Sequence, residues 1–171
     1  VEGDALSYSA SSSDDNVNTD VDGSQLTLTP AANFNGSATI TVVVNDASGG
    51  SDSDSFELTV NAVNDAPVIS EVEDQNMDED GSLEIYLYGA DVETGEHQLM
   101  FSASSDNEDI EVSVTNSFID ILIITASNNY NGSGIITVTV TDEGGLSDSD
   151  SFELTVNAVN DAPAITGGDD L

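Results

Sequence analysis

One fourteen-residue string, DSFELTVNAVNDAP, occurs twice in this sequence without a change, at residues 54–67 and again at 150–163. The two copies start 96 residues apart, and the segments Asn33-Phe34-Asn35-Gly36 and Asn129-Tyr130-Asn131-Gly132 keep the same spacing. A fixed period identifies the architectural unit of a chain. This unit is a small domain rather than a short solenoid repeat, so we expect tandem domains whose joint carries the repeated string.

Apolar and polar residues alternate along several short runs that are rich in Val, Ile and Thr and bounded by Gly, Asn, Asp and Ser. This pattern is typical of strands with one buried face, and short strands at regular intervals favour an antiparallel β-sandwich. The predicted inward faces are Ile136, Val138 and Val140 with their copies Ile40, Val42 and Val44; Phe152, Leu154 and Val156 with their copies Phe56, Leu58 and Val60; and Leu83, Ile85 and Leu87.

The period divides the chain into one whole repeat and two incomplete ones. We expect a partial repeat at 1–64 that lacks its first strand or strands, a complete repeat at 65–160, and the start of a third repeat at 161–171. A sandwich that lacks strands has an unpaired edge and an open groove, which another strand could fill.

The charge of the chain excludes several classes of partner. The sequence has 34 Asp and Glu residues, no Lys or Arg and one His, for a formal charge of −34. Without cationic side chains it has nothing to bind nucleic-acid phosphates or an anionic membrane surface. Self-repulsion of this size destabilises a compact fold unless salt or a bound cation reduces it. With no cysteine for disulfides, an oxygen-ligated metal ion is the remaining way to fasten the chain.

Acidic and amide side chains gather in loops that a sandwich would bring to its two ends. Calcium takes six to eight oxygen ligands from carboxylates, amides, backbone carbonyls and water, and alternating acids beside glycine suit it better than magnesium. The alternative is that these acids are solvated loop residues. The loops are Asn61-Ala62-Val63-Asn64-Asp65 and its copy at 157–161, Asp91-Val92-Glu93-Thr94-Gly95-Glu96, Asp142-Glu143-Gly144-Gly145, and Asp78-Glu79-Asp80-Gly81.

The order of these motifs resembles bacterial cadherin-like repeats, which occur in giant RTX-type adhesins and related surface proteins. Val-Asn-Asp-Ala-Pro ends a strand, Glu-Asp-Gly precedes the next strand, and Asp-x-Glu-x-Gly and Asn-Tyr-Asn-Gly-Ser follow. The resemblance covers essentially the whole chain. It implies a seven-stranded Greek-key sandwich, Ig-like in class, with Ca²⁺ bound where consecutive domains join.

The resemblance also implies two sets of calcium ligands. The first junction would use Asn61, Asn64, Asp65, Asp91, Glu93 and Asp142, and the second Glu79, Asn157, Asn160 and Asp161. The chain departs from the family of animal cadherins where their Asp-Arg-Glu motif stands, because Asn33–Gly36 and Asn129–Gly132 occupy that position. The glycine-rich nonapeptide repeat of RTX proteins is also absent from this sequence.

Other features have plainer interpretations. Thr137, Thr139 and Thr141 fit the outer half of a strand better than an ice-binding plane. Tyr86 and Tyr88 could stack on sugar rings or pack at a sheet edge, and His97 fits a solvated loop residue. No nucleophile elbow or phosphate-binding loop occurs, and the acids look solvated or metal-bound, which disfavours a raised carboxyl pKa. We therefore do not expect an enzyme.

Three functions fit these observations. The first is a calcium-stiffened spacer of a secreted, cell-surface adhesin, in a Gram-negative, marine or high-salt setting, whose partners are neighbouring repeats of the same polypeptide. The second is a carbohydrate-binding module, and the third is a filament subunit assembled by exchange of strands between copies. The unchanged joint favours the spacer.

Overall fold

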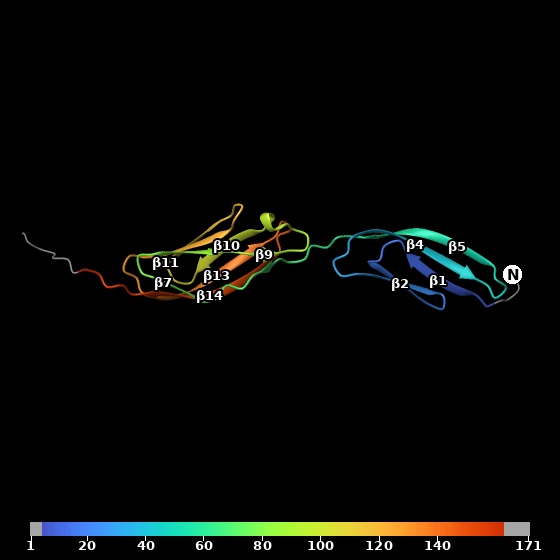
Figure 1. Ribbon diagram of the computed structural model, residues 1–171, viewed down its shortest axis with the longest axis horizontal. Helices are drawn as coiled ribbons and strands as arrows, with labels where there is room; N and C mark the ends of the chain where they lie inside the picture. Colours follow the sequence, from blue (N-terminus) through green and yellow to red (C-terminus); the bar gives the residue numbers. More distant parts are fainter. Residues whose placement is uncertain (1–4, 163–171) are drawn as a thin grey trace, which may run out of the picture. The chain divides into compact units, whose positions relative to one another are not determined.

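The computed structural model describes residues 5–162, except for the side chain of Glu96. The chain divides into two compact units, the first ending at Val63 and the second beginning at Asn64. Figure 1 shows that both units consist of β-strands joined by turns. One short 3-10 helix, η1 (Glu96–Gln98), interrupts the second unit. The prediction of an all-β fold is confirmed.

The second unit arranges its strands in two facing layers. One sheet has the order β10-β13-β14-β7, the other β11-β12-β8, and β6 pairs with β9 just beyond β8. The strands of this unit are β6 (Val68–Ile69), β7 (Gln75–Asp78), β8 (Ser82–Tyr86), β9 (Gly89–Ala90), β10 (Met100–Ser105), β11 (Ile110–Thr115), β12 (Ile121–Ala126), β13 (Gly132–Thr141) and β14 (Ser147–Asn157).

The start of the second unit departs from the expected antiparallel sandwich of seven strands. Its first strand is split: β6 runs antiparallel to β9, and the chain then crosses to the other sheet, where β7 runs parallel to β14. The segment Ser82–Ala90 is also broken, into β8 and β9. These breaks give nine strands among the residues described for this unit. The alternation of side chains predicts strands, but it does not fix which sheet each one joins.

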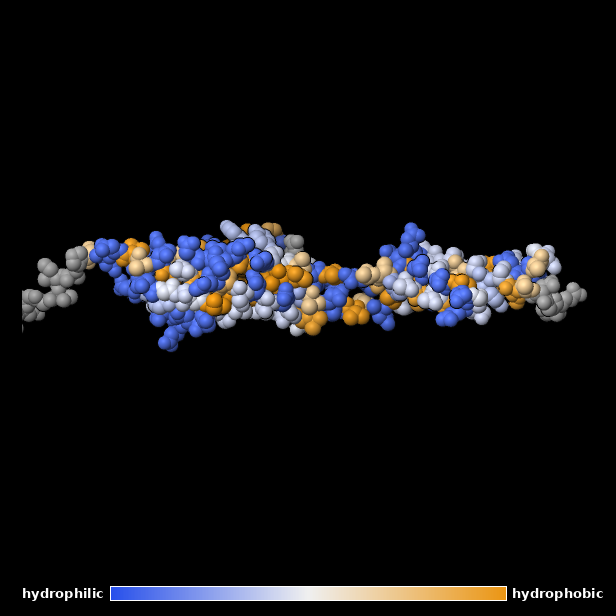
Figure 2. All heavy atoms as spheres, turned by 90° about the horizontal axis from the view of Figure 1, so that it is seen from below, coloured by the Kyte–Doolittle hydropathy of each residue, from blue (hydrophilic) through white to orange (hydrophobic). Residues whose placement is uncertain are grey.

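The core of the second unit is built from the predicted inward faces. Ile136, Val138 and Val140 are fully buried, and Phe152, Leu154 and Val156 are at most 3% exposed, as expected. Met77, Leu87, Phe101, Leu122 and Ile124 complete the core from the neighbouring strands. Hydrophilic residues cover much of the outer face of this unit shown in Figure 2, with hydrophobic patches between them.

The Asn-x-Asn-Gly motif forms the turn before β13, and before the equivalent strand of the first unit, rather than a ligand loop. Asn129 has a φ of 57°, and its copy Asn33 has a φ of 60°, a left-handed conformation that Asn tolerates better than most residues. Tyr130 accepts a hydrogen bond at its hydroxyl from Asn107 Nδ2 at 2.6 Å. These contacts explain the motif as a structural turn.

The first unit is smaller and has a smaller buried core. A sheet of order β1-β4-β5 faces the β2-β3 hairpin, and the buried residues are Val17, Ala38 and Ile40. Its described residues include no counterpart of β6, β7, β8 or β9. The strands are β1 (Ser7–Ser12), β2 (Val17–Asp22), β3 (Gln25–Pro30), β4 (Gly36–Asn45) and β5 (Ser51–Val60).

The repeated strand has two different environments. Phe152 in β14 is 2% exposed, whereas its copy Phe56 in β5 is 46% exposed, and Leu58 and Val60 are only half-buried. The prediction that Phe56, Leu58 and Val60 form a buried face is therefore wrong for this unit. The sequence of the strand is the same in both copies, so the difference comes from its surroundings. β7 pairs with β14 and β8 pairs with β12, and neither strand has a counterpart in the described part of the first unit.

The aspartates of the repeated strand show the same difference. Asp148 Oδ2 accepts the backbone N–H of Ile69 at 3.1 Å, and Asp150 Oδ2 accepts that of Val72 at 2.7 Å. Among the described residues, their copies Asp52 and Asp54 accept only the N–H of the residue that follows each of them. The first unit thus presents acceptors suited to a strand of the β6–β7 type.

We predict that residues 64–91, placed directly ahead of Val1, will stabilise the first unit. The added segment supplies counterparts of β6 to β9, and burying Phe56 alone should contribute roughly 1 kcal/mol. Hydrogen exchange of the β5 amides should slow and the melting temperature should rise. A matched segment with Met77→Ser and Ile85→Ser should give a much smaller gain. Equal gains from both segments would contradict the prediction.

Candidate metal centre

The segment that opens the second unit is fastened to two acidic loops. Asn64 Nδ2 donates to Asp142 Oδ2 at 2.7 Å, and the backbone N–H of Asp65 donates to Glu93 Oε2 at 3.1 Å. Both linker residues are exposed, while Pro67 just after them is buried. Four residues predicted for the first junction are thus joined in pairs at one end of this unit. Asn61, which is exposed, belongs to the first unit.

Asp91 is the most unusual acid of the group. Its Oδ1 accepts the backbone N–H groups of Glu93, at 3.0 Å, and of Thr94, which closes a tight turn. Its Oδ2 is buried and has no hydrogen-bond partner among the described residues. A buried carboxylate oxygen without a donor is costly, and such groups in native proteins call for an unseen water or ion.

Asp142 lies at the turn between β13 and β14 and is only 5% exposed. Its Oδ1 accepts the backbone N–H of Leu146 at 2.8 Å. Burial is the largest single effect on its pKa and raises it. Hydrogen bonds from Asn64 and from the backbone of Leu146, Gly145 and Gly144 outweigh burial, so the pKa of Asp142 lies below its ordinary value of 3.8. The carboxylate is therefore held ionised.

Gly144 allows the Asn64 amide to reach Asp142. A Cβ on Gly144 would lie 2.6 Å from the Cγ, Nδ2 and Oδ1 atoms of Asn64. Sequence reasoning missed this role, as it missed Thr94, which is 7% exposed and closes the Asp91 turn. The Asp-x-x-Thr spacing is the signal that could have found Thr94, because aspartate side chains often bond backbone N–H groups two or three residues on.

The opposite end of the second unit holds the residues predicted for the second junction. Glu79 is 7% exposed; its Oε1 accepts the N–H of Val159 at 2.6 Å, and its own N–H donates to the Asn157 carbonyl at 2.9 Å. Asn160 and Asp161 are exposed, and Asn160 Nδ2 donates to the Asp161 carbonyl at 3.2 Å. Asn64 makes the same contact with Asp65 at 3.3 Å. Residues 163–171, most of the expected third repeat, lie outside the described residues.

The donor atoms at the first end fit a hard cation, although they are not assembled around one. Within residues 5–162 no three acidic or histidine side chains meet closely enough to hold a metal by themselves. The carboxylates of Asp91, Glu93 and Asp142 instead accept N–H groups. Carboxylate and amide oxygens are nevertheless the ligands that calcium prefers, and the orphaned Asp91 oxygen is suited to it.

Comparison with known families decides the class of the chain. The profile of the bacterial Ig domain family matches residues 1–59 and 64–157. The chain belongs to this family. The expectation of bacterial cadherin-like, Ig-like repeats is confirmed. Bacterial Ig domains are typical of extracellular, adhesion-related proteins, and Ig-like and cadherin-like domains are in general not enzymes.

Cadherin structures share the fold of this bacterial Ig domain chain at low identity. Cadherin domains 1–5 of protocadherin gamma B2 match with a TM-score of 0.56 and 18% identity, over 92% of this chain and 34% of that one. Drosophila N-cadherin EC1-4 matches with a TM-score of 0.52 and 17% identity, over 91% and 42%. An endo-fucoidan hydrolase of glycoside hydrolase family 107 gives a TM-score of 0.46 at 19% identity, over 93% and 24%.

The bacterial Ig domain chain thus spans less than half the length of these structures. None of the curated proteins matches it. No helix within the described residues is long and apolar enough to cross a membrane.

We predict that Asn64→Ala will lower the melting temperature by about 2–4 °C and raise the pKa of Asp142, because a hydrogen bond to a charged group is lost. Since folding lowers the pKa of Asp142, its contribution to stability is complete above pH 3.8 and is lost as the pH falls through the folded-state pKa. NMR titration and thermal unfolding in chelator measure both effects. Asn160→Ala is the matched control, because Asn160 shares the local contact but has no such carboxylate partner within residues 5–162. Equal effects of the two substitutions would refute the assignment.

Proposed function

We propose that this chain is an extender segment of a large, secreted bacterial adhesin of the RTX type, and that Ca²⁺ at the joints between its repeats stiffens it. The observation that carries the proposal is the buried, partnerless Oδ2 of Asp91, beside a linker bonded to Glu93 and Asp142. A cation there would neutralise carboxylates that no Lys or Arg is available to pair.

The proposed ligands follow from the placement of the acids. At the first joint they are Asp91, Glu93 and Asp142 with the linker residues Asn61, Asn64 and Asp65. At the second joint they are Glu79, Asn157, Asn160 and Asp161, together with a loop of the repeat that follows. When bound, calcium supplies positive charge and a shared set of oxygen contacts. The side chains themselves tie the linker to the loops after β9 and β13.

The distribution of identity between the repeats supports a spacer. The unchanged string spans the final strand and the linker, which are the parts that define the joint. Selection that keeps the joint unchanged preserves the shape of the array rather than a ligand pocket. The proposed partners are therefore neighbouring repeats, and the proposed location is the cell surface. The acidic charge excludes nucleic acid and anionic lipid as partners.

We predict that millimolar Ca²⁺ will raise the melting temperature of the second unit by roughly 10 °C or more, because a ligand at 100 times its Kd stabilises by about 2.7 kcal/mol. Chelator should reverse the gain, and small-angle scattering should show a stiffer particle with calcium than without. Asp91→Asn should remove most of the calcium-dependent gain. Asp20→Asn, the same change at an exposed aspartate of β2, should leave it intact. Melting curves that are identical with calcium and with chelator would refute the proposal.

A second candidate function is assembly by strand complementation. The observation that favours it is the open first unit, in which Phe56 is 46% exposed. Within residues 5–162, Asp52 and Asp54 also lack the strand partners of their copies. A strand from another molecule could fill this site. Concentration-dependent fibres in electron micrographs would support this function, and a monomer at all concentrations would exclude it.

A further inference from the structure

Exposed aromatic side chains gather on one side of the second unit. Tyr86 is 55% exposed, Tyr88 65% and Phe118 79%. A single exposed apolar residue needs no explanation, but several that adjoin one another mark a binding surface. They adjoin here, because all three line one hollow of about 440 Å³. This volume lies within the range of roughly 300–1,000 Å³ of small-molecule sites.

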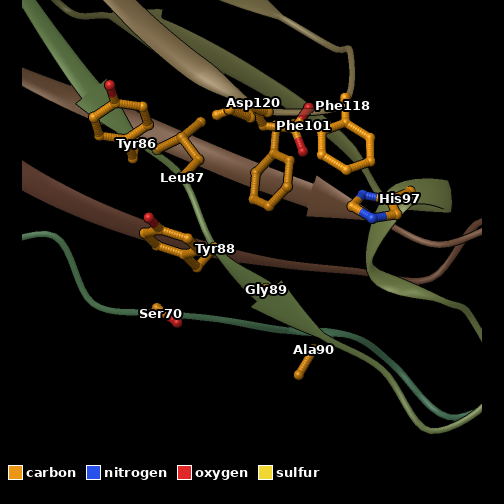
Figure 3. A pocket seen from close by; sticks show the side chains of 11 residues that line it. Ser70, Tyr86, Leu87, Tyr88, Gly89, Ala90, His97, Phe101, Phe118 and Asp120 are labelled. Atoms are coloured by element: carbon orange, nitrogen blue, oxygen red, sulfur yellow. The ribbon is translucent and has the colours of Figure 1, made fainter.

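The hollow has an apolar floor and aromatic sides. Leu87 and Phe101, each 4% exposed, form the floor. Figure 3 shows Phe101 at the centre, the two tyrosines on one side, and Phe118 with His97 on the other. A Cβ on Gly89 would lie 3.3 Å from Phe101 Cζ, so the absence of a side chain at this position lets the backbone lie against the floor.

Phe118 is held in place despite its exposure. Its ring stacks on His97, with centroids 4.6 Å apart and an angle of 25° between the planes. His97 belongs to η1, and Phe118 to the loop between β11 and β12, so the stack joins two separate segments. The exposed wall of the hollow is thereby ordered before any ligand arrives, which reduces the entropic cost of binding.

Asp120 gives the hollow a free hydrogen-bond acceptor. Its backbone carbonyl accepts the N–H of Leu87 at 2.9 Å, but its half-buried carboxylate accepts no hydrogen bond within the described residues. The half-buried aspartates Asp148 and Asp150 both bind backbone N–H groups. In Figure 3 the carboxylate of Asp120 lies beside the rings of Phe101 and Phe118. It is therefore placed to accept hydrogen bonds from a ligand.

Charge and shape together select the class of ligand. The chain has no Lys or Arg, so a phosphate, sulfate or carboxylate would be repelled. An organic cation is best held by rings that close around one point, whereas these rings stand on opposite sides of a wide hollow. A neutral sugar has flat apolar faces for such rings and hydroxyl groups for Asp120 and Ser70, which also lines the hollow.

We propose that this hollow is a binding site for a neutral sugar, in which Tyr86, Tyr88 and Phe118 stack on the pyranose rings and Asp120 accepts their hydroxyl groups. The site lies wholly within the second unit and does not rest on the proposed calcium sites. It would allow an extender repeat to bind glycans weakly at its side.

The test is binding to the whole chain in chelator, measured by calorimetry and by NMR shifts of the aromatic rings. The probes are neutral disaccharides of glucose, galactose or mannose, with tetraethylammonium as the cationic comparator and a sulfated disaccharide as the anionic one. We expect at least one neutral disaccharide to bind at millimolar concentration and to shift the rings of Tyr88 and Phe118. The two charged probes should bind more weakly.

Four variants make the test specific. Tyr88→Ala and Phe118→Ala should each weaken binding about tenfold, because a stacking surface is lost, and Asp120→Asn should weaken it by a similar factor, because a charged acceptor is lost. The control Tyr8→Ala removes a partly exposed tyrosine of the first unit and should change nothing. Failure of all the neutral probes, tighter binding of tetraethylammonium, dependence on calcium, or affinity unchanged in both ring variants would each overturn the proposal.

Discussion

Carboxylates without cationic partners are the constraint on which this structure depends. The chain has 34 acids and no Lys or Arg, so the N–H groups of the chain are the main donors available to an acid near the core. The carboxylates of Asp148 and Asp150 accept backbone N–H groups of Ile69 and Val72, where the chain crosses between the sheets. In the same way Asp106 accepts the N–H of Ile135, and Asp142 that of Leu146. In most proteins salt bridges share this role. Here backbone N–H groups take the place of cationic partners for these four acids, and most of their hydrogen bonds hold separate segments of the chain together.

The two copies of the repeated strand separate the effect of sequence from that of surroundings. Phe56 and Phe152 occupy the same position of the same string, yet one is 46% exposed and the other 2%. The strand forms in both units because its alternation and its β-hairpin with the preceding strand are local. Its burial requires β7 and β8, which come from a different part of the repeat. The local sequence pattern therefore determines that the strand forms, whereas segments distant in the sequence determine how deeply its side chains are buried.

The sequence predicts those features of the fold that depend on interactions between residues close together in the chain. Alternation identified Ile136, Val138 and Val140 as core, because side chains of a strand must point to opposite faces. It could not show that β7 pairs in parallel with β14, since pairing depends on the three-dimensional path. The linker residues Asn64 and Asp65 do contact loops that the sequence singled out, while their role in holding metal stays a prediction. The alternation around Leu83, Ile85 and Leu87 points to Tyr86 and Tyr88 as exposed aromatics of the hollow, whereas Phe118 and Asp120 lie in a loop without periodicity.

The parallel pairing of β7 with β14 has a mechanical consequence. The segment before β7 leads back toward Asn64. The strand β14 ends at Asn157, whose carbonyl accepts the N–H of Glu79, and the Glu79 carboxylate accepts the N–H of Val159 just beyond. In a parallel pair these two ends of the chain leave from opposite ends of the ladder. A pull between them would slide the strands along each other and load the bonds of the ladder simultaneously. An element that breaks all at once withstands more tension than one that unzips bond by bond.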